Sequence, residues 1–326
     1  MNPFAIRLLV AAALVLSVAT ACRRDGHPSD PRGRSGKPQI LTTTGMLADL
    51  ARNVAGPNLQ VTALMGSGVD PHLYKASAGD VSRLARADLI LYNGLHLEAR
   101  MADILGDGRL REKSVPVGER LERERLLVAE SDGKTYDPHF WFDATLWLDA
   151  ARVVRDEMSR RFPQQAAEFE TNTARYVAEL ESLDREVRKR IEAIPEPQRV
   201  LITAHDAFRY FGRAYGIEVR GLQGISTASE AGTADVENLA AFIVSRRIPA
   251  LFVESSVPPR TIEAVQQAVR AKGFDVRLGG ELYSDSLGDA GTPEGTYIGM
   301  MRHNVSVIVA GLSPADLATT AAEAAP

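Results

Sequence analysis

The chain has 326 residues, of which 45% are hydrophobic and 25% are charged. This is the composition of a folded globular protein with room for two domains. The formal net charge of -4 leaves no basic footprint for nucleic acid, so we expect no nucleic-acid partner.

The first residues have the pattern of an export signal rather than of a folded element. Arg7 precedes an unbroken apolar run over 8–16, and mostly small residues follow over 17–21. We therefore predict a signal peptide over residues 1–21. The apolar run is too short to cross a bilayer as a stable helix, so a transmembrane anchor is the weaker interpretation.

Cys22 is the only cysteine of the chain, which excludes an intramolecular disulfide. The sequence VATAC that ends at Cys22 resembles a bacterial lipobox, whose cysteine becomes the lipidated first residue of the mature protein. We predict this lipid anchor to the membrane; cleavage after Ala21 by the ordinary signal peptidase, which releases a soluble protein, is the alternative. Residues 22–37 lack a hydrophobic pattern and form a predicted flexible tether.

Residues 38–162 alternate short β-prone runs with helical ones. Strands are predicted over 39–43, 59–64, 89–92 and 114–117, and helices over 46–54, 97–105 and 145–161. A further helix starts from a capping-box-like pair, Ser77 and Asp80, and runs to residue 86. The charged stretch 118–136 has little periodicity and is predicted as a loop.

Residues 195–326 repeat this alternation. Strands are predicted over 199–203, 217–222, 250–254 and 274–278, and helices over 207–214, 233–247, 259–272 and 297–312. Strands that alternate with helices indicate an α/β fold, so we predict two lobes, each a mostly parallel sheet flanked by helices.

The segment between the lobes, residues 163–194, is predicted to be one long linker helix. Its apolar residues recur three or four apart and form one stripe: Phe169, Tyr176, Leu180, Leu183, Val187, Ile191 and Ile194. Pro163 suits the first turn, and Pro195 cannot continue the helix. At about 1.5 Å per residue the helix spans roughly 45–50 Å, which is long enough to contact both lobes; an ordinary long core helix is the alternative.

Three of the six histidines, His72, His139 and His205, lie on predicted loops at strand or helix ends, where α/β sites form. Each has an acid within two residues, namely Asp70, Asp137 and Asp206. Neutral imidazole is a common ligand of divalent transition metals, and Asp285 on a later loop would complete a four-coordinate set of three nitrogens and one oxygen. The other histidines, at 27, 96 and 303, are interpreted as structural or surface residues.

Several segments resemble the metal-binding subunits of bacterial zinc/manganese ABC importers, the cluster A-I solute-binding proteins typified by TroA, ZnuA and PsaA. They occur in the family's order over 68–98, 137–143 (DPHFWFD), 203–217, 252–265, 282–288 and 296–305. The resemblance implies that His72, His139, His205 and Asp285 are the metal ligands, two from each lobe. It also implies a monomeric, exported, non-enzymatic protein that hands its ion to an ABC permease and its ATPase, with the long helix as a strut that keeps closure small.

The cargo stays open between zinc and manganese, with iron a further possibility. Zinc-type relatives usually carry a His-rich loop, whereas residues 115–136 contain no histidine; manganese-type relatives often have Glu at the position of His205. Three imidazoles and one carboxylate favour zinc. Two other functions remain: a secreted zinc hydrolase, although the chain has no HExxH and Asp285 would close the site, and a metal-independent surface adhesin.

Overall fold

A computed structural model describes residues 36–129 and 133–313. The fold set out below belongs to one compact unit, Pro38–Pro326. The predicted signal peptide over 1–21, Cys22 and residues 23–35 of the predicted tether lie outside the described residues. Among the helices of the described part, none is both long enough and apolar enough to cross a membrane.

The first lobe is built on a four-stranded, wholly parallel sheet with the order β2-β1-β3-β4. Its strands are β1 Gln39–Thr42, β2 Gln60–Ala63, β3 Leu89–Tyr92 and β4 Ser114–Pro116. The two central strands, QILT and LILY, are almost continuously buried, as expected for parallel strands that are covered on both faces. All four strands therefore end at one edge of the sheet, and the loop that carries His72 leaves that edge after β2.

The helices of the first lobe are α2 Gly45–Ala55, α3 Ala78–Arg86, α4 Ala102–Leu105, α5 Gly108–Arg111 and α6 Ala144–Arg161. The predicted capping box at Ser77 and Asp80 is confirmed, with both reciprocal hydrogen bonds present. The prediction of one helix over 97–105 is wrong, because a 3-10 turn, Ala99–Met101, precedes the short α4. The carboxylate of Glu98 accepts hydrogen bonds from the backbone N–H groups of Asn93 and Gly94, and this fixes a turn before residue 99.

The second lobe has two parallel strand pairs, β5 with β6 and β7 with β8, and β5 lies beside β7. Its strands are β5 Val200–His205, β6 Glu218–Gln223, β7 Ala250–Glu254 and β8 Arg277–Leu282, and its helices are α8 Arg209–Tyr215, α9 Thr233–Arg246, α10 Arg260–Ala271 and α11 Tyr297–Leu312. The predicted last strand, 274–278, is misplaced, because the observed strand begins at Arg277 and continues through Gly279 and Gly280 to Leu282. A Cβ on Gly279 would lie 2.6 Å from the ring of Phe252, so the strand requires glycine there.

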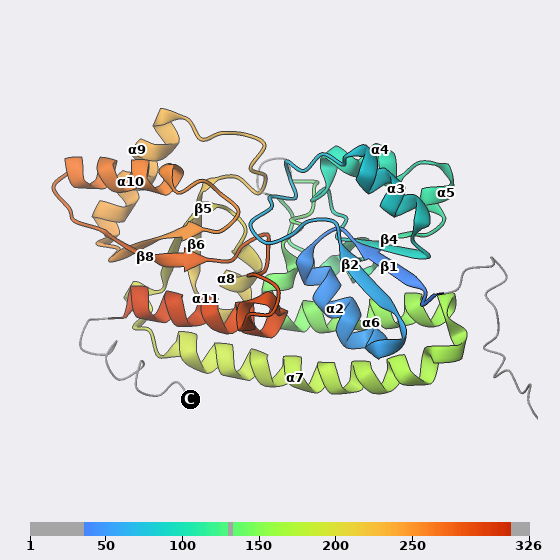
Figure 1. Cartoon of the computed structure of the whole chain (residues 1–326). Helices are drawn as coiled ribbons and strands as arrows, with labels where there is room; N and C mark the ends of the chain where they lie inside the picture. Colours follow the sequence, from blue (N-terminus) through green and yellow to red (C-terminus); the bar gives the residue numbers. More distant parts are fainter. Residues whose placement is uncertain (1–35, 130–132, 314–326) are drawn as a thin grey trace, which may run out of the picture. The chain divides into compact units, whose positions relative to one another are not determined.

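The long helix α7, Ala166–Glu192, has 27 residues and follows a 3-10 turn, Pro163–Gln165. Its buried residues are Phe169, Thr173, Tyr176, Leu180, Leu183, Val187 and Ile191, which confirms the predicted apolar stripe up to Ile191. The helix is shorter than the predicted 163–194, so Ile194 lies beyond its end. The helix packs against α2 and α6 of the first lobe and against α8 and α11 of the second (Figure 1). The predicted α/β fold with two lobes joined by one long helix is confirmed.

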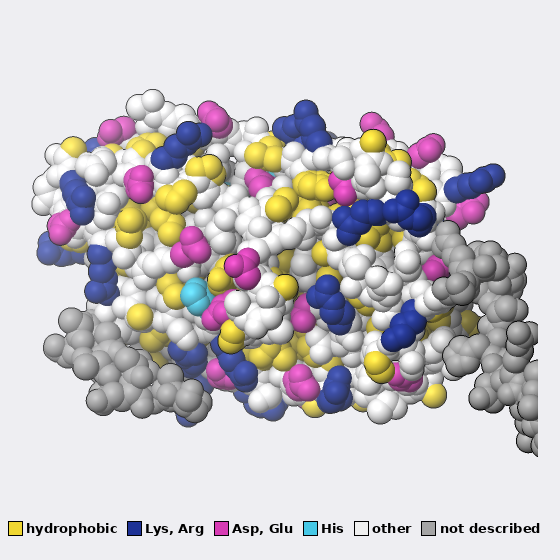
Figure 2. Space-filling model, viewed as in Figure 1, with side chains coloured by type: hydrophobic (Ala, Val, Ile, Leu, Met, Phe, Trp, Pro, Cys, Tyr) yellow, Lys and Arg dark blue, Asp and Glu magenta, His cyan; other side chains and the backbone are white. Residues whose placement is uncertain are grey.

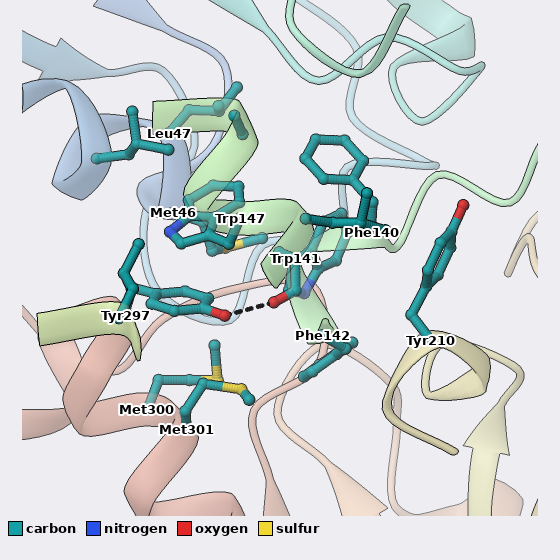
Figure 3. Packing of buried hydrophobic residues seen from close by; sticks show 14 of the residues in the cluster. Met46, Leu47, Phe140, Trp141, Phe142, Trp147, Tyr210, Tyr297, Met300 and Met301 are labelled. Atoms are coloured by element: carbon teal, nitrogen blue, oxygen red, sulfur yellow. Dashed lines mark hydrogen bonds between the residues drawn. The ribbon is translucent and has the colours of Figure 1, made fainter. Parts of the chain in front are cut away.

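One hydrophobic core continues from the first lobe into the second. Trp147 of α6 stacks on Tyr297 of α11 with ring centroids 5.0 Å apart, and Phe142 stacks on Phe208 at 4.3 Å. The hydroxyl of Tyr297 donates to the carbonyl of Trp141, as Figure 3 shows. Full burial of each such side chain contributes roughly 1.5–3 kcal/mol, so separation of the lobes along this seam is strongly opposed.

The surface in Figure 2 carries basic and acidic side chains interspersed over the face in view. Many of the arginines in the described residues pair with nearby acids, for example Arg302 with Glu186 and Arg188 with Asp184. This face therefore presents no large field of one sign.

Candidate metal centre

Four side chains that lie far apart in the sequence meet in the interior: His72, His139, His205 and Asp285. His72 follows β2, His139 precedes the 3-10 turn Phe140–Phe142, His205 is the last residue of β5, and Asp285 follows β8. Each offers one ligand atom, and these atoms all lie within 4.8 Å of one another. The structure thus brings together all four residues that the sequence predicted as ligands, and all four are buried.

The spacing of the donor atoms fits a four-coordinate ion. The Nε2 atoms of His72, His139 and His205 lie 3.6, 3.4 and 3.3 Å from the nearest carboxylate oxygen of Asp285. The Nε2 atoms of His72 and His139 are 3.4 Å apart. Four donors placed tetrahedrally 2.0–2.1 Å from a zinc ion are about 3.3 Å from one another. These four distances are therefore close to those of a tetrahedral site, in a cluster whose donor atoms all lie within 4.8 Å of one another.

Two of the rings are oriented by carboxylates on their outer side. Asp137 Oδ1 lies 2.8 Å from His139 Nδ1, and Glu254 Oε2 lies 2.6 Å from His205 Nδ1. A carboxylate on Nδ1 holds the proton there and leaves Nε2 free to bind a metal ion. Both rings thus point their Nε2 atoms toward Asp285.

Glu254 is a residue of the site that the sequence did not predict. The acid next to His205 in the sequence, Asp206, instead forms an ion pair with Arg209, at 3.6 Å. Glu254 ends the apolar strand β7 and is only 2% exposed, and a charged residue at the carboxyl end of a buried strand was the available signal. Asp70, the acid near His72, contacts the backbone N–H of that histidine rather than its ring.

Burial and the neighbouring charges set the protonation of the cluster. Burial lowers the pKa of His72 to about 3. Burial also opposes the charge on His139, but the hydrogen bond to Asp137 and the close negative charges of Asp137 and Asp285 outweigh it and raise the pKa to about 9. In the same way Glu254 and Asp285 raise the pKa of His205 against its burial. Burial acts to raise the pKa of Asp285, but the charge of His205 and the contact with His139 outweigh it and hold that pKa well below its usual value. At neutral pH the ion-free cluster therefore holds protons that a metal ion must displace.

The loop that carries His139 is attached to several elements. Asn93 Nδ2 donates to the carbonyl of Pro138, Tyr210 donates to that of Asp137, and Trp141 Nε1 donates to that of Ser284. These contacts place the His139 ring against Asp285.

The cluster leaves polar atoms that a cation would satisfy. Both carboxylate oxygens of Asp285 and Nε2 of His205 are fully buried and have no hydrogen bond of good geometry within the described residues. Buried polar atoms without partners are costly, so an ion bound between them would stabilise the fold. The other described histidines lie outside the cluster: His96 is exposed in a left-handed turn, and His303 packs against Tyr283.

Comparisons with known proteins agree with this geometry. The model of the ZnuA family, described as "Zinc-uptake complex component A periplasmic", matches residues 40–311. The zinc-binding protein TroA of Treponema pallidum is 49% identical over 279 residues, which cover 85% of this chain and 90% of TroA. The manganese-binding lipoprotein MntA of Bacillus subtilis is 46% identical over 305 residues, 93% of this chain and 98% of MntA.

The solved structures give the same result. The solved structure of the periplasmic zinc-binding protein TroA of Treponema pallidum matches this one with a TM-score of 0.83 and 49% identity, over 86% of this chain and all of that one. The predicted resemblance is thereby confirmed. The chain belongs to the ZnuA family, the periplasmic A components of zinc-uptake complexes.

Proposed function

We propose that the protein captures a divalent transition metal ion outside the cytoplasm and delivers it to the permease and ATPase of an ABC importer. The observation that carries this proposal is the buried set of three imidazoles and one carboxylate at tetrahedral spacing. The names of the relatives support it, since TroA is a zinc-binding protein and MntA a manganese-binding lipoprotein. His72, His139, His205 and Asp285 are the proposed ligands.

Zinc is the cargo that the geometry favours. The imidazole nitrogens lie 3.3–3.6 Å from the Asp285 carboxylate, close to the donor spacing of four-coordinate zinc. Imidazole also suits zinc better than manganese, which prefers oxygen ligands in octahedral sets. Manganese is the second candidate because the 46% identical relative MntA is a manganese-binding lipoprotein. A competition between the two ions in one buffer therefore decides the cargo better than either affinity alone.

The rest of the chain serves this role as follows. Residues 1–21 direct export, Cys22 carries a lipid anchor, and residues 22–37 tether two metal-binding lobes, 38–162 and 195–326, joined by the helical segment 163–194. The curated relative from Streptococcus parasanguinis, 30% identical, is named a metal ABC transporter substrate-binding lipoprotein, which supports the anchor. The protein works as a monomer and has no catalytic activity, since four protein ligands leave no open position for a reactive water.

The test is a titration of chelator-treated protein with zinc and with manganese. We expect one ion per chain, with a rise in melting temperature of several degrees, because a ligand at a thousand times its dissociation constant adds about 4 kcal/mol. Asp285→Ala should abolish this rise, whereas the control Asp103→Ala, on the exposed face of α4, should keep it. An unchanged melting curve with both ions would refute the proposal, and metal-dependent turnover of an ester or peptide would favour the hydrolase.

A further inference from the structure

A buried carboxylate outside the metal cluster, that of Glu98, lies at the carboxyl edge of the first sheet. Glu98 is 4% exposed, and it binds groups that follow the two central strands, β1 and β3. Its Oε1 accepts the hydroxyl of Thr43 at 2.6 Å and the backbone N–H of Asn93 at 2.8 Å, and its Oε2 accepts the backbone N–H of Gly94 at 3.1 Å. Burial raises the pKa of Glu98, whereas these hydrogen bonds act to lower it. Three donors thus compensate the burial of one carboxylate.

The turn that Glu98 closes has a strained backbone. Gly94, Leu95 and His96 follow one another with φ of +76°, +53° and +67°. Glycine takes these angles freely, but for the other two residues they are unfavourable. Such a conformation persists only where the surroundings fix it, and it is frequent at functional sites. Here the carboxylate fixes the start of the turn, since it binds the N–H groups of Asn93 and Gly94.

Asn93, at the start of this turn, holds the segment that carries His139. It is 1% exposed, and its Nδ2 donates to the carbonyl of Pro138 at 3.0 Å. The carbonyl of Asn93 accepts the N–H of Gly118 at 2.8 Å. A Cβ on Gly118 would lie 2.8 Å from that carbonyl oxygen and 2.8 Å from the ring of Phe140, so the three groups are in close contact. Asn93 is thus fixed against residues on both sides of His139.

His139 tolerates little displacement of its backbone. Its Nδ1 lies 2.8 Å from Asp137 of the same loop, and its Nε2 lies 3.4 Å from Asp285 of the second lobe. Asp137 would move together with the loop, whereas Asp285 would stay behind. A shift of the loop therefore changes the distance between two ligands, and metal sites keep their ligand distances within about 0.2 Å. The contact of Asn93 with Pro138 acts directly on this distance.

We propose that Glu98 is a positioning residue of the metal centre and acts on His139 through Asn93; this rests on the proposed metal-binding function. The carboxylate holds the strained turn, the turn holds the amide of Asn93 on the carbonyl of Pro138, and this contact sets the backbone of His139. The first lobe thus keeps one ligand in place with a buried carboxylate that acts through the backbone, whereas Glu254 of the second lobe contacts its histidine directly.

The test compares the zinc affinity of the wild type with that of Glu98→Gln, measured by competition with a chelator. The amide keeps the size of the side chain, but its NH2 group cannot accept, so one of the backbone contacts is lost. Zinc should bind about tenfold more weakly, the lower end of the cost of losing a group that orients a ligand. Asp88→Asn is the matched control, because Asp88 is also buried and accepts the N–H of Gln39 at 2.9 Å, but at the opposite edge of the same sheet. This control should bind zinc as the wild type does.

A double-mutant cycle separates this role from a merely structural one. In a His139→Ala background the ligand that Glu98 positions is absent, so the addition of Glu98→Gln should change zinc affinity by less than about twofold. A loss in this background as large as in the wild type, or no loss in Glu98→Gln alone, would overturn the proposal.

Thr43→Val tests the same contact if Glu98→Gln does not fold. Valine keeps the shape of threonine and removes the hydroxyl that donates to Glu98, so zinc should again bind more weakly. Thr43→Ser restores the hydroxyl and should bind zinc nearly as the wild type does. Equal affinities of the valine and serine variants would contradict the role of Glu98.

A further measurement needs no metal ion. Amide hydrogen exchange of the ion-free protein should be faster over residues 139–143 in Glu98→Gln and in Asn93→Ala, and unchanged over β5. The N–H groups of His139, Phe142 and Asp143 are hydrogen-bonded within this loop, so their exchange reports its opening. If the wild type binds neither zinc nor manganese, the proposed function fails; unchanged exchange over 139–143 refutes the positioning role separately.

Discussion

Glu254 contacts His205 at two points, although the two residues are 49 positions apart in the sequence. Its Oε1 accepts the backbone N–H of His205 at 2.9 Å, and its Oε2 lies 2.6 Å from Nδ1 of the ring. The end of β7 thereby fixes both the position and the orientation of a proposed ligand at the end of the neighbouring strand β5. A carboxylate in this position also makes the imidazole a stronger metal ligand.

Glu254→Gln should therefore lower zinc affinity by a factor of about 10–100, the usual cost of losing a carboxylate behind a histidine ligand. The amide keeps the size of the side chain and loses its charge, so the fold should be retained. Isothermal titration against a competing chelator measures the change. The control is Glu281→Gln, an exposed residue of β8, which should bind zinc as the wild type does. Equal affinities of both variants would show that Glu254 is only structural.

The pH dependence of binding should extend well above the ordinary histidine range. The pKa of His139 is raised to about 9, and that of His205 is also raised, so both rings hold protons at pH 7 in the ion-free cluster. Zinc must displace these protons, so affinity should keep rising from pH 6 to about 9, by up to about tenfold per pH unit for each proton released. Proton release on binding, measured at pH 7 in weak buffer with an indicator dye, should be close to two per ion. A profile that is already flat above pH 7 would contradict the raised pKa values.

The ion-free protein should show the opposite trend in stability. A histidine whose pKa is raised by folding adds stability that is complete below its unfolded value, about 6.5, and is lost as the pH rises through its folded value. For His139 that loss extends to about pH 9. The melting temperature of chelator-treated protein should therefore fall by several degrees between pH 6.5 and 9. His139→Gln, which cannot titrate, should show a smaller fall, and a rising melting temperature would mean that the rings are neutral.

His205→Glu should shift the preference between ions. The change replaces a nitrogen donor with oxygen, which suits manganese better, so the zinc-to-manganese affinity ratio should drop. The new carboxylate would lie beside Glu254, which now accepts from His205, so the double variant with Glu254→Gln removes this repulsion. Competition of the two ions in one buffer measures the ratio. An unchanged ratio, with both affinities reduced by His205→Ala, would mean that His205 is a ligand without a role in selectivity.

The lipid anchor is tested separately. Labelling of producing bacterial cells with a palmitate analogue should mark the full-length protein, and Cys22→Ala should abolish the label, because Cys22 is the only cysteine. Cys22→Ser is a second variant that keeps the size of the side chain. A wild-type protein without label would favour cleavage by the ordinary signal peptidase, and label that survives both substitutions would contradict lipidation at Cys22.

The sequence by itself determined the class of fold and the four side chains of the cluster. Local signals sufficed for the elements: the apolar stripe from Phe169 to Ile191 predicted α7, and the pair Ser77 and Asp80 predicted the start of α3. The loops that carry His72, His139, His205 and Asp285 could be recognised because strand ends and short motifs are local features of a chain.

Only the tertiary structure decided which groups support these four. Glu254 rather than the adjacent Asp206 is the partner of His205, because β7 lies beside β5, and no spacing in the sequence encodes which strands become neighbours. The contact between Thr227 and Asp70 joins residues 157 positions apart. The extension of β8 through Gly279 and Gly280 likewise depends on the Phe252 ring, which leaves no space there for a side chain. Contacts between distant segments form only when the chain packs, and they decide how the four residues are oriented and enclosed.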